Sequence, residues 1–330
     1  MFNRKLVLVL AILIVLALLA AISGAYAQAP GGATFSQLGS ENDTSSSRLE
    51  ILTAGVYIIN IGKIDLQTGS YDLDFYFWLS TSDPSTDFTK NKPTFDFMNS
   101  MNARIEPSQL TSNYYEVRVK GTFLKNMDFR NYPFDTQQVT VEVEGFTTVD
   151  KLVFEPDTAS SGYDNLVNVP GWKLGEIKQD VIVHKYPDQS YSRFIFSFNI
   201  ERSPLSSFLK TIFPVIIITT IAMLAFWMSP TNFAPRIGLA ASTLLAAVAA
   251  HLNAANALPP IGYLTLMDKV MIVAYALFLN NLVSMVLQMR LIDHKSDEQA
   301  AKVNAKMRKL MPVIVGILLA LLVPFDLRVV

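Results

Sequence analysis

Side chains able to do catalytic chemistry are not arranged in this sequence as known catalytic motifs require, although carboxylates are plentiful, with 28 Asp and Glu. Its three histidines, His184, His251 and His294, fall in three different regions, and the chain contains no cysteine. It also lacks the motifs G-x-x-x-x-G-K-[ST], G-x-G-x-x-G, H-E-x-x-H and G-x-S-x-G. Without cysteine, neither disulfides nor thiolate metal sites can form. We therefore expect no enzyme, no catalytic residue, no metal site and no cofactor.

One short segment combines charges, aromatic rings and a proline in a way that fits neither a regular strand nor a helix. In NMDFRNYPFDTQQV, residues 126–139, Asp128, Arg130 and Asp135 surround Tyr132-Pro133-Phe134. Proline lacks the backbone N–H that a strand or helix interior needs. We expect a structured loop that touches both a polar and an apolar environment.

A second pattern runs along the apolar segment that begins at Phe233. Residues three and four apart lie on one face of a helix. Along this segment that face carries small or polar residues first, apolar residues in the middle and a polar residue at the end. Such a stripe is typical of a helix–helix contact, or of an aqueous path between several copies whose apolar part gates by dewetting. The candidate pore-lining residues are Ala234, Gly238, Ser242, Leu245, Ala249, Leu252 and Asn256. His251 lies off this stripe, and we expect it to hydrogen-bond a neighbouring helix, with proton sensing as the alternative.

The rest of the chain divides into an exported part and a membrane part. Of its 330 residues, 51% are hydrophobic and 17% charged, with a mean hydropathy of +0.31. The apolar residues concentrate near the N-terminus and after residue 205. Four later segments, at about 205–228, 233–257, 262–289 and 309–326, are long enough for transmembrane helices. We therefore expect residues 204–330 to form a multi-pass transmembrane domain.

Charge predicts the orientation of these helices in the cell membrane. Residues 290–309 hold six basic residues against three acidic ones, which places the expected loop 290–308 in the cytoplasm. At the N-terminus, a basic and then apolar run ends in Ala25-Tyr26-Ala27 and predicts a signal peptide over residues 1–27, with an uncleaved anchor as the alternative. The domain 28–203 and the C-terminus are then extracellular or periplasmic.

The exported part consists of short stretches of alternating polarity, separated by Gly, Pro, Asp and Asn. Several short strands at this spacing predict an antiparallel, immunoglobulin-like β-sandwich. Between Gln28 and Ser203 there are 23 acidic and 15 basic residues, a net charge of −8. This charge argues against a nucleic-acid partner and enriches cations locally. The expected strands are 48–65, 71–80, 114–124, 137–146, 151–156 and 191–201.

Together these features resemble the pentameric ligand-gated ion channels, the Cys-loop receptor superfamily, and most closely their prokaryotic members. The similarity covers about residues 48–328 and rests on three motifs: MDFRNYPFD-x-Q, IERSPLSSFLKTIFP and RIGLAASTLLA. Lys125 and Val139 occupy the positions of the bridging cysteines of animal receptors, and prokaryotic relatives also lack that bridge. The resemblance implies a homopentamer in the lipid bilayer that conducts inorganic ions. It implies opening by a small extracellular ligand, by protons or by divalent ions.

The resemblance also implies how ligand binding is coupled to the pore. Asp65, Asp128 and Arg202 are expected to meet at the membrane boundary, where a buried charge that loses its partner is costly. Tyr132-Pro133-Phe134 is expected among the outer helix ends. A salt bridge that only closes a turn is the alternative for the charged residues. The candidate gating and coupling residues are Asp65, Asp128, Tyr132, Pro133, Phe134, Asp135 and Arg202.

For the ligand, the resemblance implies a site at a subunit interface, beneath a hairpin at His184–Arg193. Aromatic rings there can hold a cation by cation–π attraction, although most rings of a sandwich belong to its core. The candidates are Tyr186 and Tyr191 of the hairpin, Phe95 and Phe146 of neighbouring loops, and Tyr76 and Arg118 of the adjacent subunit.

Two questions stay open at the level of sequence. The cytoplasmic end of the second helix, NFAPRIG, lacks the glutamate of cation-selective relatives and is similar to the entrance of the glycine and GABA receptors, whereas the exported domain is acidic. The balance favours anions slightly. A membrane-anchored binding or adhesion protein without a pore is the alternative function. A transporter is disfavoured because no internal repeat is visible.

Overall fold

The stretches of alternating polarity form a β-sandwich in the computed structural model, which describes residues 49–326. The predicted signal peptide, residues 1–27, lies outside this range. A strand is present at each of the six predicted stretches, which confirms these predictions. These strands are β1 (Glu50–Asp65), β2 (Ser70–Ser80), β5 (Tyr114–Leu124), β6 (Thr136–Thr148), β7 (Leu152–Pro156) and β10 (Ser190–Arg202).

Four further strands complete the sandwich: β3 (Phe95–Phe97), β4 (Arg104–Leu110), β8 (Gly162–Tyr163) and β9 (Trp172–Lys185). Every residue of β4 is exposed, and the strand contains Pro107, which suits the edge of a sheet. No residue of β9 is fully buried, and charged residues punctuate it. Their apolar pattern is therefore weak, which is why the sequence did not reveal them as strands.

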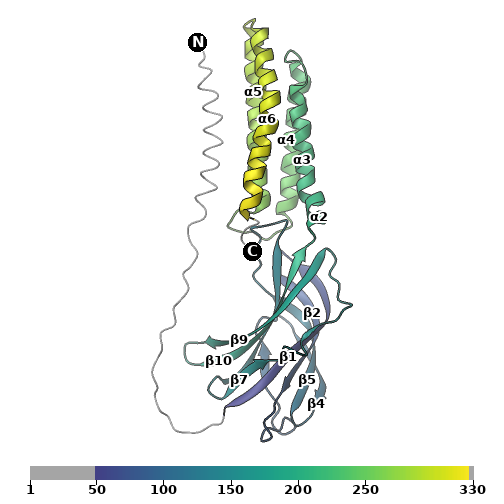
Figure 1. Ribbon diagram of the computed structural model, residues 1–330, viewed down its shortest axis with the longest axis vertical. Coiled ribbons are helices and arrows are strands. Elements are labelled where there is room, and N and C mark those ends of the chain that lie inside the picture. The colour runs from purple at the N-terminus through teal and green to yellow at the C-terminus, as the bar shows by residue number, and fades with distance from the viewer. Residues whose placement is uncertain (1–48, 327–330) are drawn as a thin grey trace. The chain divides into compact units, whose positions relative to one another are not determined.

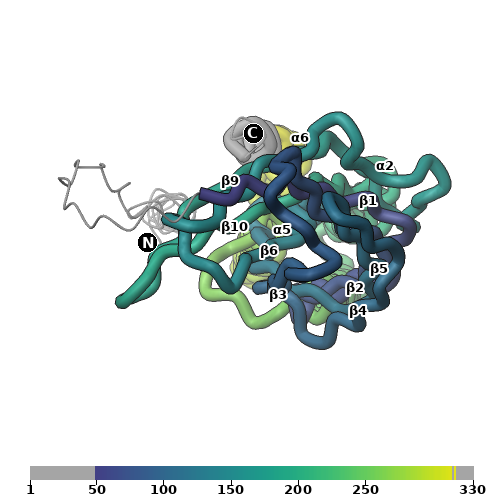
Figure 2. The backbone as a smooth tube through the Cα atoms, turned by 90° about the horizontal axis from the view of Figure 1, so that it is seen from below, coloured from purple at the N-terminus to yellow at the C-terminus, as the bar shows by residue number. Residues whose placement is uncertain are grey.

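The strands lie in two sheets (Figures 1 and 2). The six-stranded sheet has the order β4-β5-β2-β1-β7, with β8 also paired to β1, and the four-stranded sheet has the order β3-β6-β10-β9. Strands β7 and β8 run parallel to β1, whereas the other pairs are antiparallel. The predicted sandwich class is thus confirmed.

A buried tyrosine joins the two sheets in place of a disulfide. Tyr71 of β2 is fully buried, and its hydroxyl donates to the Thr140 carbonyl of β6 at 2.8 Å. The same hydroxyl oxygen accepts from the Thr140 amide at 3.1 Å and from Asn99 Nδ2 at 3.1 Å. Around it pack inward-facing valines and phenylalanines of both sheets, so one satisfied polar cluster sits within an apolar core.

The apolar segments after residue 203 form the helical unit (Figure 1). The first is α2 (Pro204–Ser207), a π-helical turn η2 (Phe208–Ile212), α3 (Phe213–Met223) and a 3-10 turn η3 (Leu224–Phe226). The π turn ends two residues before Pro214, whose missing N–H disturbs the regular hydrogen-bond ladder of the helix. Then follow α4 (Phe233–Ala255), α5 (Leu266–Asp293) and α6 (Asp297–Asp326).

Within the described residues, three helical segments are long and apolar enough to cross a membrane: Pro204–Phe226, Phe233–Ala255 and Leu266–Asp293. Two predicted boundaries are wrong. Helix α5 begins at Leu266 rather than 262, because Thr265 and Asp268 form a capping box there. The predicted loop 290–308 is mostly helical, since α5 continues to Asp293 and α6 starts at Asp297. Its Ala, Lys, Gln and Met residues all favour helix, so the segment is helical although it also carries many charges.

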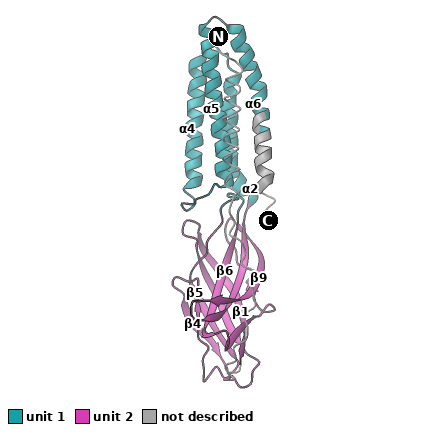
Figure 3. Ribbon diagram, turned by 90° about the vertical axis from the view of Figure 1, so that its left-hand side faces the viewer, with its two compact units in different colours: residues 1–32, 129–135, 204–330 teal, residues 33–128, 136–203 magenta. Residues whose placement is uncertain are grey.

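The chain separates into two units, which Figure 3 shows in different colours. The helices form one unit and the sandwich forms the other. Residues Phe129–Asp135, which lie between strands β5 and β6 in sequence, group with the helices. The segment singled out in the sequence therefore belongs structurally to the helical unit.

Replacing the core tyrosine tests how the sheets are joined. We expect Tyr71→Phe to lower the free energy of unfolding by about 1–3 kcal/mol, because Asn99 and Thr140 lose a buried partner. Thermal unfolding of the purified full-length chain in detergent measures the change. Tyr191→Phe is the control, since it removes an exposed hydrogen bond to Gln189. Equal melting temperatures for the two variants would contradict this account.

Candidate functional site

The predicted pore-lining stripe lies on the side of α4 that faces away from its own bundle. All seven residues are exposed in the chain, and Leu245 and Leu252 are 70% and 58% exposed. The opposite face, with Ala240, Thr243, Ala247 and Ala254, is buried. A helix–helix contact within the chain therefore does not account for the stripe. Its lining of a pore stays a prediction.

At the start of α4, Arg236 is fully buried and anchors the helix to its neighbours. Its guanidinium donates to the Ala225 carbonyl at 2.9 Å, to Gln288 Oε1 at 3.0 Å and to Asn304 Oδ1 at 2.9 Å. Asn304 in turn donates to the Phe226 carbonyl at 2.9 Å. These acceptors are uncharged, so among residues 49–326 no carboxylate is paired with the guanidinium.

Near the other end of α4, His251 bridges to α5. Its Nδ1 lies 3.0 Å from the Tyr275 hydroxyl, and its Nε2 lies 2.9 Å from Asp268 Oδ1. The other carboxylate oxygen of Asp268 accepts from the Thr265 amide and hydroxyl, both at 2.8 Å. The expected interhelical hydrogen bond of His251 is thus confirmed, and it joins the cap of α5 to α4.

The segment Phe129–Asp135 binds the start of α5 through its backbone. The amide of Leu266 donates to the Arg130 carbonyl at 2.8 Å, and the amide of Met267 donates to the Tyr132 carbonyl at 3.1 Å. The first amides of a helix have no partner within the helix, so this segment supplies what α5 lacks. The Phe129 amide also donates to the Tyr263 hydroxyl at 3.0 Å.

The side chains of this segment are largely enclosed. Tyr132, Pro133 and Asp135 are buried and Phe134 is half-buried, while the Arg130 guanidinium lies 5.3 Å from the centre of the Tyr263 ring. The loop proper is Lys125–Asp135, because β6 begins at Thr136. The expected placement at helix ends is therefore seen for the backbone around Tyr132. The gating roles of Tyr132, Pro133, Phe134 and Asp135 stay predictions.

Each residue of the predicted charge cluster makes contacts within the sandwich unit. Asp65 pairs with Lys63 at 2.8 Å and accepts from the Gln67 amide at 3.0 Å, and the hydrogen bond from Lys63 holds the pKa of Asp65 below its ordinary value. Asp128 exchanges hydrogen bonds with the Gln137 side chain, at 3.1 and 2.7 Å. The Arg202 guanidinium lies 4.4 Å from the centre of the Trp172 ring. Asp65 thus closes a turn, and a meeting of the three stays a prediction.

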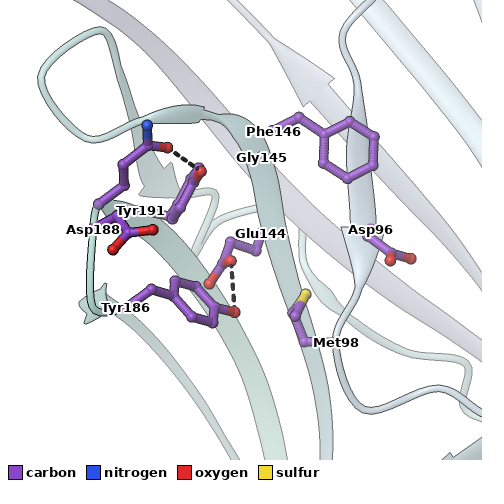
Figure 4. A pocket seen from close by; sticks show the side chains of 9 residues that line it. Asp96, Met98, Glu144, Gly145, Phe146, Tyr186, Asp188 and Tyr191 are labelled. Carbon is purple, nitrogen blue, oxygen red and sulfur yellow. Dashed lines mark hydrogen bonds between the residues drawn. The ribbon is translucent and has the colours of Figure 1, made fainter.

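The predicted ligand hairpin, between β9 and β10, covers one side of a cavity of about 470 Å³ (Figure 4). Strand β6 forms its floor and β3 its far side. Aromatic rings and carboxylates line it together, an arrangement that suits a cation. The lining residues are Asp96, Met98, Glu144, Gly145, Phe146, Tyr186, Asp188, Gln189 and Tyr191.

Within this cavity, Glu144 is the most enclosed charge. The Tyr186 hydroxyl donates to its Oε1 at 3.1 Å, and Arg193 Nε donates to its Oε2 at 3.0 Å. Loss of water contact and the bond to Glu144 raise the pKa of the Tyr186 hydroxyl. The tyrosine therefore stays a neutral donor, and the ring faces the cavity with its hydroxyl fixed (Figure 4).

The predicted ligand residues fall into three groups. Phe146, Tyr186 and Tyr191 line the cavity. Phe95 does not line it, because its ring packs 4.8 Å from Phe77 against the core, and its part in ligand binding stays a prediction. Tyr76 and Arg118 lie on β2 and β5 of the other sheet, where Arg118 binds Asp74 through two hydrogen bonds of 2.9 Å. Their contribution to a neighbouring copy stays a prediction.

Sequence reasoning missed the carboxylates Asp96, Glu144 and Asp188. A signal for Asp96 existed: side chains alternate along a strand, so an inward Phe95 turns the next residue outward. Glu144 follows the same alternation in QVTVEVEG, where Val143 is buried in the core. The acidic character of the cavity could thus have been inferred from the two strands.

No protein-family model matches the chain. The chain is similar to the gamma-aminobutyric acid receptor subunit beta-4 of Gallus gallus, with 30% identity over 161 residues, 47% of this chain and 32% of that protein. It is also similar to a proton-gated ion channel of Gloeobacter violaceus, with 24% identity over 288 residues, 80% of this chain and 79% of that protein. The chain thus spans about a third of the length of the first relative and most of the second.

Proposed function

We propose that the chain is a pentameric ligand-gated ion channel of the Cys-loop receptor superfamily, of the prokaryotic, cysteine-free type. In this proposal five copies surround a central pore in the cell membrane, with the sandwich outside the cytoplasm. The observation that carries it is the face of α4. Seven residues at helical spacing are exposed, while the opposite face packs into the bundle. A symmetric ring gives that exposed face a second copy to meet and an axis to line.

The proposal makes binding, coupling and conduction one sequence of events. A ligand occupies the cavity beneath the β9–β10 hairpin, the loop Lys125–Asp135 moves with the sandwich, and its hold on the start of α5 changes. Through the bond of Asp268 to His251, the start of α5 is joined to α4. The apolar girdle at Leu245 and Leu252 then widens and fills with water.

Electrical recording tests the proposal directly. The purified chain, reconstituted in planar lipid bilayers, is expected to give discrete current steps. A membrane-anchored adhesion protein, the alternative function, gives none under the same conditions.

The apolar girdle predicts how one substitution changes gating. Leu245→Ala shortens a side chain that is 70% exposed on the proposed pore face, which eases hydration of the constriction. We expect a higher open probability without ligand. Leu244→Ala, on an adjacent and half-buried position, is the matched control. Unchanged gating by Leu245→Ala in single-channel records would count against the girdle.

For the ligand, we propose a small organic cation. The rings of Tyr186, Tyr191 and Phe146 offer cation–π attraction, and Asp96 and Asp188 add negative charge at the mouth of the cavity. One relative is named a proton-gated channel, so acidification and Ca²⁺ are the competing stimuli.

Concentration–response curves with ethylammonium and tetramethylammonium test this ligand class. Asp188→Asn is expected to raise the half-maximal concentration by up to about fivefold, because one exposed charge partner of the cation is lost. Asp150→Asn, an exposed carboxylate outside the cavity, is the control. Opening by acid alone, with no response to either ammonium ion, overturns the proposed ligand class.

We propose anions as the permeant ions. The stripe carries no carboxylate, and Arg236 holds an uncompensated positive charge behind the start of α4. The acidic sandwich acts in the opposite direction, but it lies outside the helical unit. In asymmetric NaCl the reversal potential is expected to follow the chloride gradient. A reversal potential that follows sodium contradicts this selectivity.

A further inference from the structure

A row of alternating charges leaves the floor of the cavity and ends at the loop. Arg193 of β10 donates to Glu144 at 3.0 Å and, through its other nitrogen, to Glu142 at 3.3 Å. Glu142 Oε1 lies 3.6 Å from Lys125 Nζ. We call Glu144, Arg193, Glu142 and Lys125 the charge row. Arg193 is shared by Glu144 and Glu142, and Glu142 is shared by Arg193 and Lys125, so none of the three ion pairs is independent of the next.

The charge row is partly shielded from water, which makes its pairing consequential. The side chains of Glu144, Arg193, Glu142 and Lys125 are 8%, 12%, 17% and 32% exposed. Charges in such surroundings interact more strongly than on an open surface, and leaving one unpaired is costly. A change of charge at Glu144, the most buried member of the row, therefore alters the electrostatic energy of Arg193 with little screening by water.

The charge row ends at Lys125, where the chain enters the loop. We call this entrance, formed by Lys125, Asp128 and Gln137, the neck of the loop. Lys125 directly follows β5, and its amide donates to the Gly69 carbonyl at 2.9 Å. Gly69 has φ +68°, and a Cβ there would lie 2.5 Å from the Lys125 carbonyl oxygen, so the approach requires glycine. One turn on, Asp128 and Gln137 close the neck by their paired hydrogen bonds. The neck is thus tied by an ion pair and amide contacts.

We propose that Glu142 is the positioning residue that links the ligand cavity to the loop, by dividing its carboxylate between Arg193 and Lys125. A cation in the cavity competes with Arg193 for Glu144. Arg193 then turns more of its charge to Glu142, and Glu142 releases Lys125 at the neck. This inference rests on the proposed function in one respect: that the cavity binds the ligand and that the loop transmits its effect to the pore.

Hydrogen–deuterium exchange of the purified full-length chain tests this link without ligand and without current. Amides of the loop are protected by hydrogen bonds, including Tyr132 to Phe129 at 3.0 Å and Phe134 to Asn131 at 2.8 Å. We expect Glu144→Gln to raise the amide exchange rates of residues 126–135 by about two- to thirtyfold, because Glu142 then releases Lys125. In a Glu142→Gln background the same substitution is expected to have no effect on these residues.

Matched variants separate the link from general damage. Asp150→Asn removes an exposed carboxylate outside both the cavity and the charge row and is expected to leave loop exchange unchanged. Lys125→Gln is expected to reproduce Glu142→Gln, and Lys125→Arg to restore normal exchange. Exchange in β2 and β5 reports the fold of each variant, and Lys125→Gln replaces Glu142→Gln if the latter unfolds.

An equal effect of Glu144→Gln with and without Glu142 overturns the proposed link. So does loss of protection in Lys125→Arg. If the chain conducts current but Glu144→Gln acts equally with and without Glu142, the proposed function stands and only the role of the charge row is overturned. If the exchange is coupled through Glu142 but no current is seen in bilayers, the link stands and the proposed function is overturned.

Discussion

The first amides of α5 depend on the carbonyls of Arg130 and Tyr132, and much of the molecule is arranged around this contact. A helix end without partners is costly in an apolar setting, because its N–H groups cannot turn to water. The chain satisfies them with a segment that interrupts the sandwich sequence between β5 and β6. Any displacement of that segment therefore acts on the start of α5. Asp268, in the same first turn of α5, is hydrogen-bonded to His251 of α4, so the position of this turn also affects α4.

The sandwich solves a different problem, which is to hold its sheets together without cysteine. The buried hydroxyl of Tyr71 of β2 joins the two sheets by its bond to Thr140 of β6, while the ion pairs of Arg193 with Glu142 and Glu144 tie β10 to β6 within the four-stranded sheet. Such bonds are reversible and can be redistributed when a charge arrives, whereas a disulfide would fix the loop neck. The absence of the bridge at Lys125 and Val139 is thus consistent with a neck controlled by charge.

The sequence predicted elements with strong periodicity and missed those without it. Apolar and polar residues alternate in the sequence around Phe75 and Val141, which revealed these strands, whereas β9 buries neither face fully and β4 lies at an edge. The α4 stripe was predictable because its residues recur at steps of three and four, with small or polar residues towards both ends and leucines between them. The partners of Arg236 were not, since Gln288 and Asn304 lie far along the chain and carry no motif. Likewise, only the fold brings Arg193 between two glutamates.

Cysteine accessibility tests the central claim, that the exposed face of α4 lines the ion path. The chain has no cysteine, so a single introduced thiol is read without background. Ala249→Cys lies on the exposed face and Ala247→Cys on the buried face. During bilayer recording, a charged methanethiosulfonate reagent is expected to change the current of Ala249→Cys and to leave Ala247→Cys unchanged. Modification that alters Ala247→Cys, or neither variant, contradicts the account.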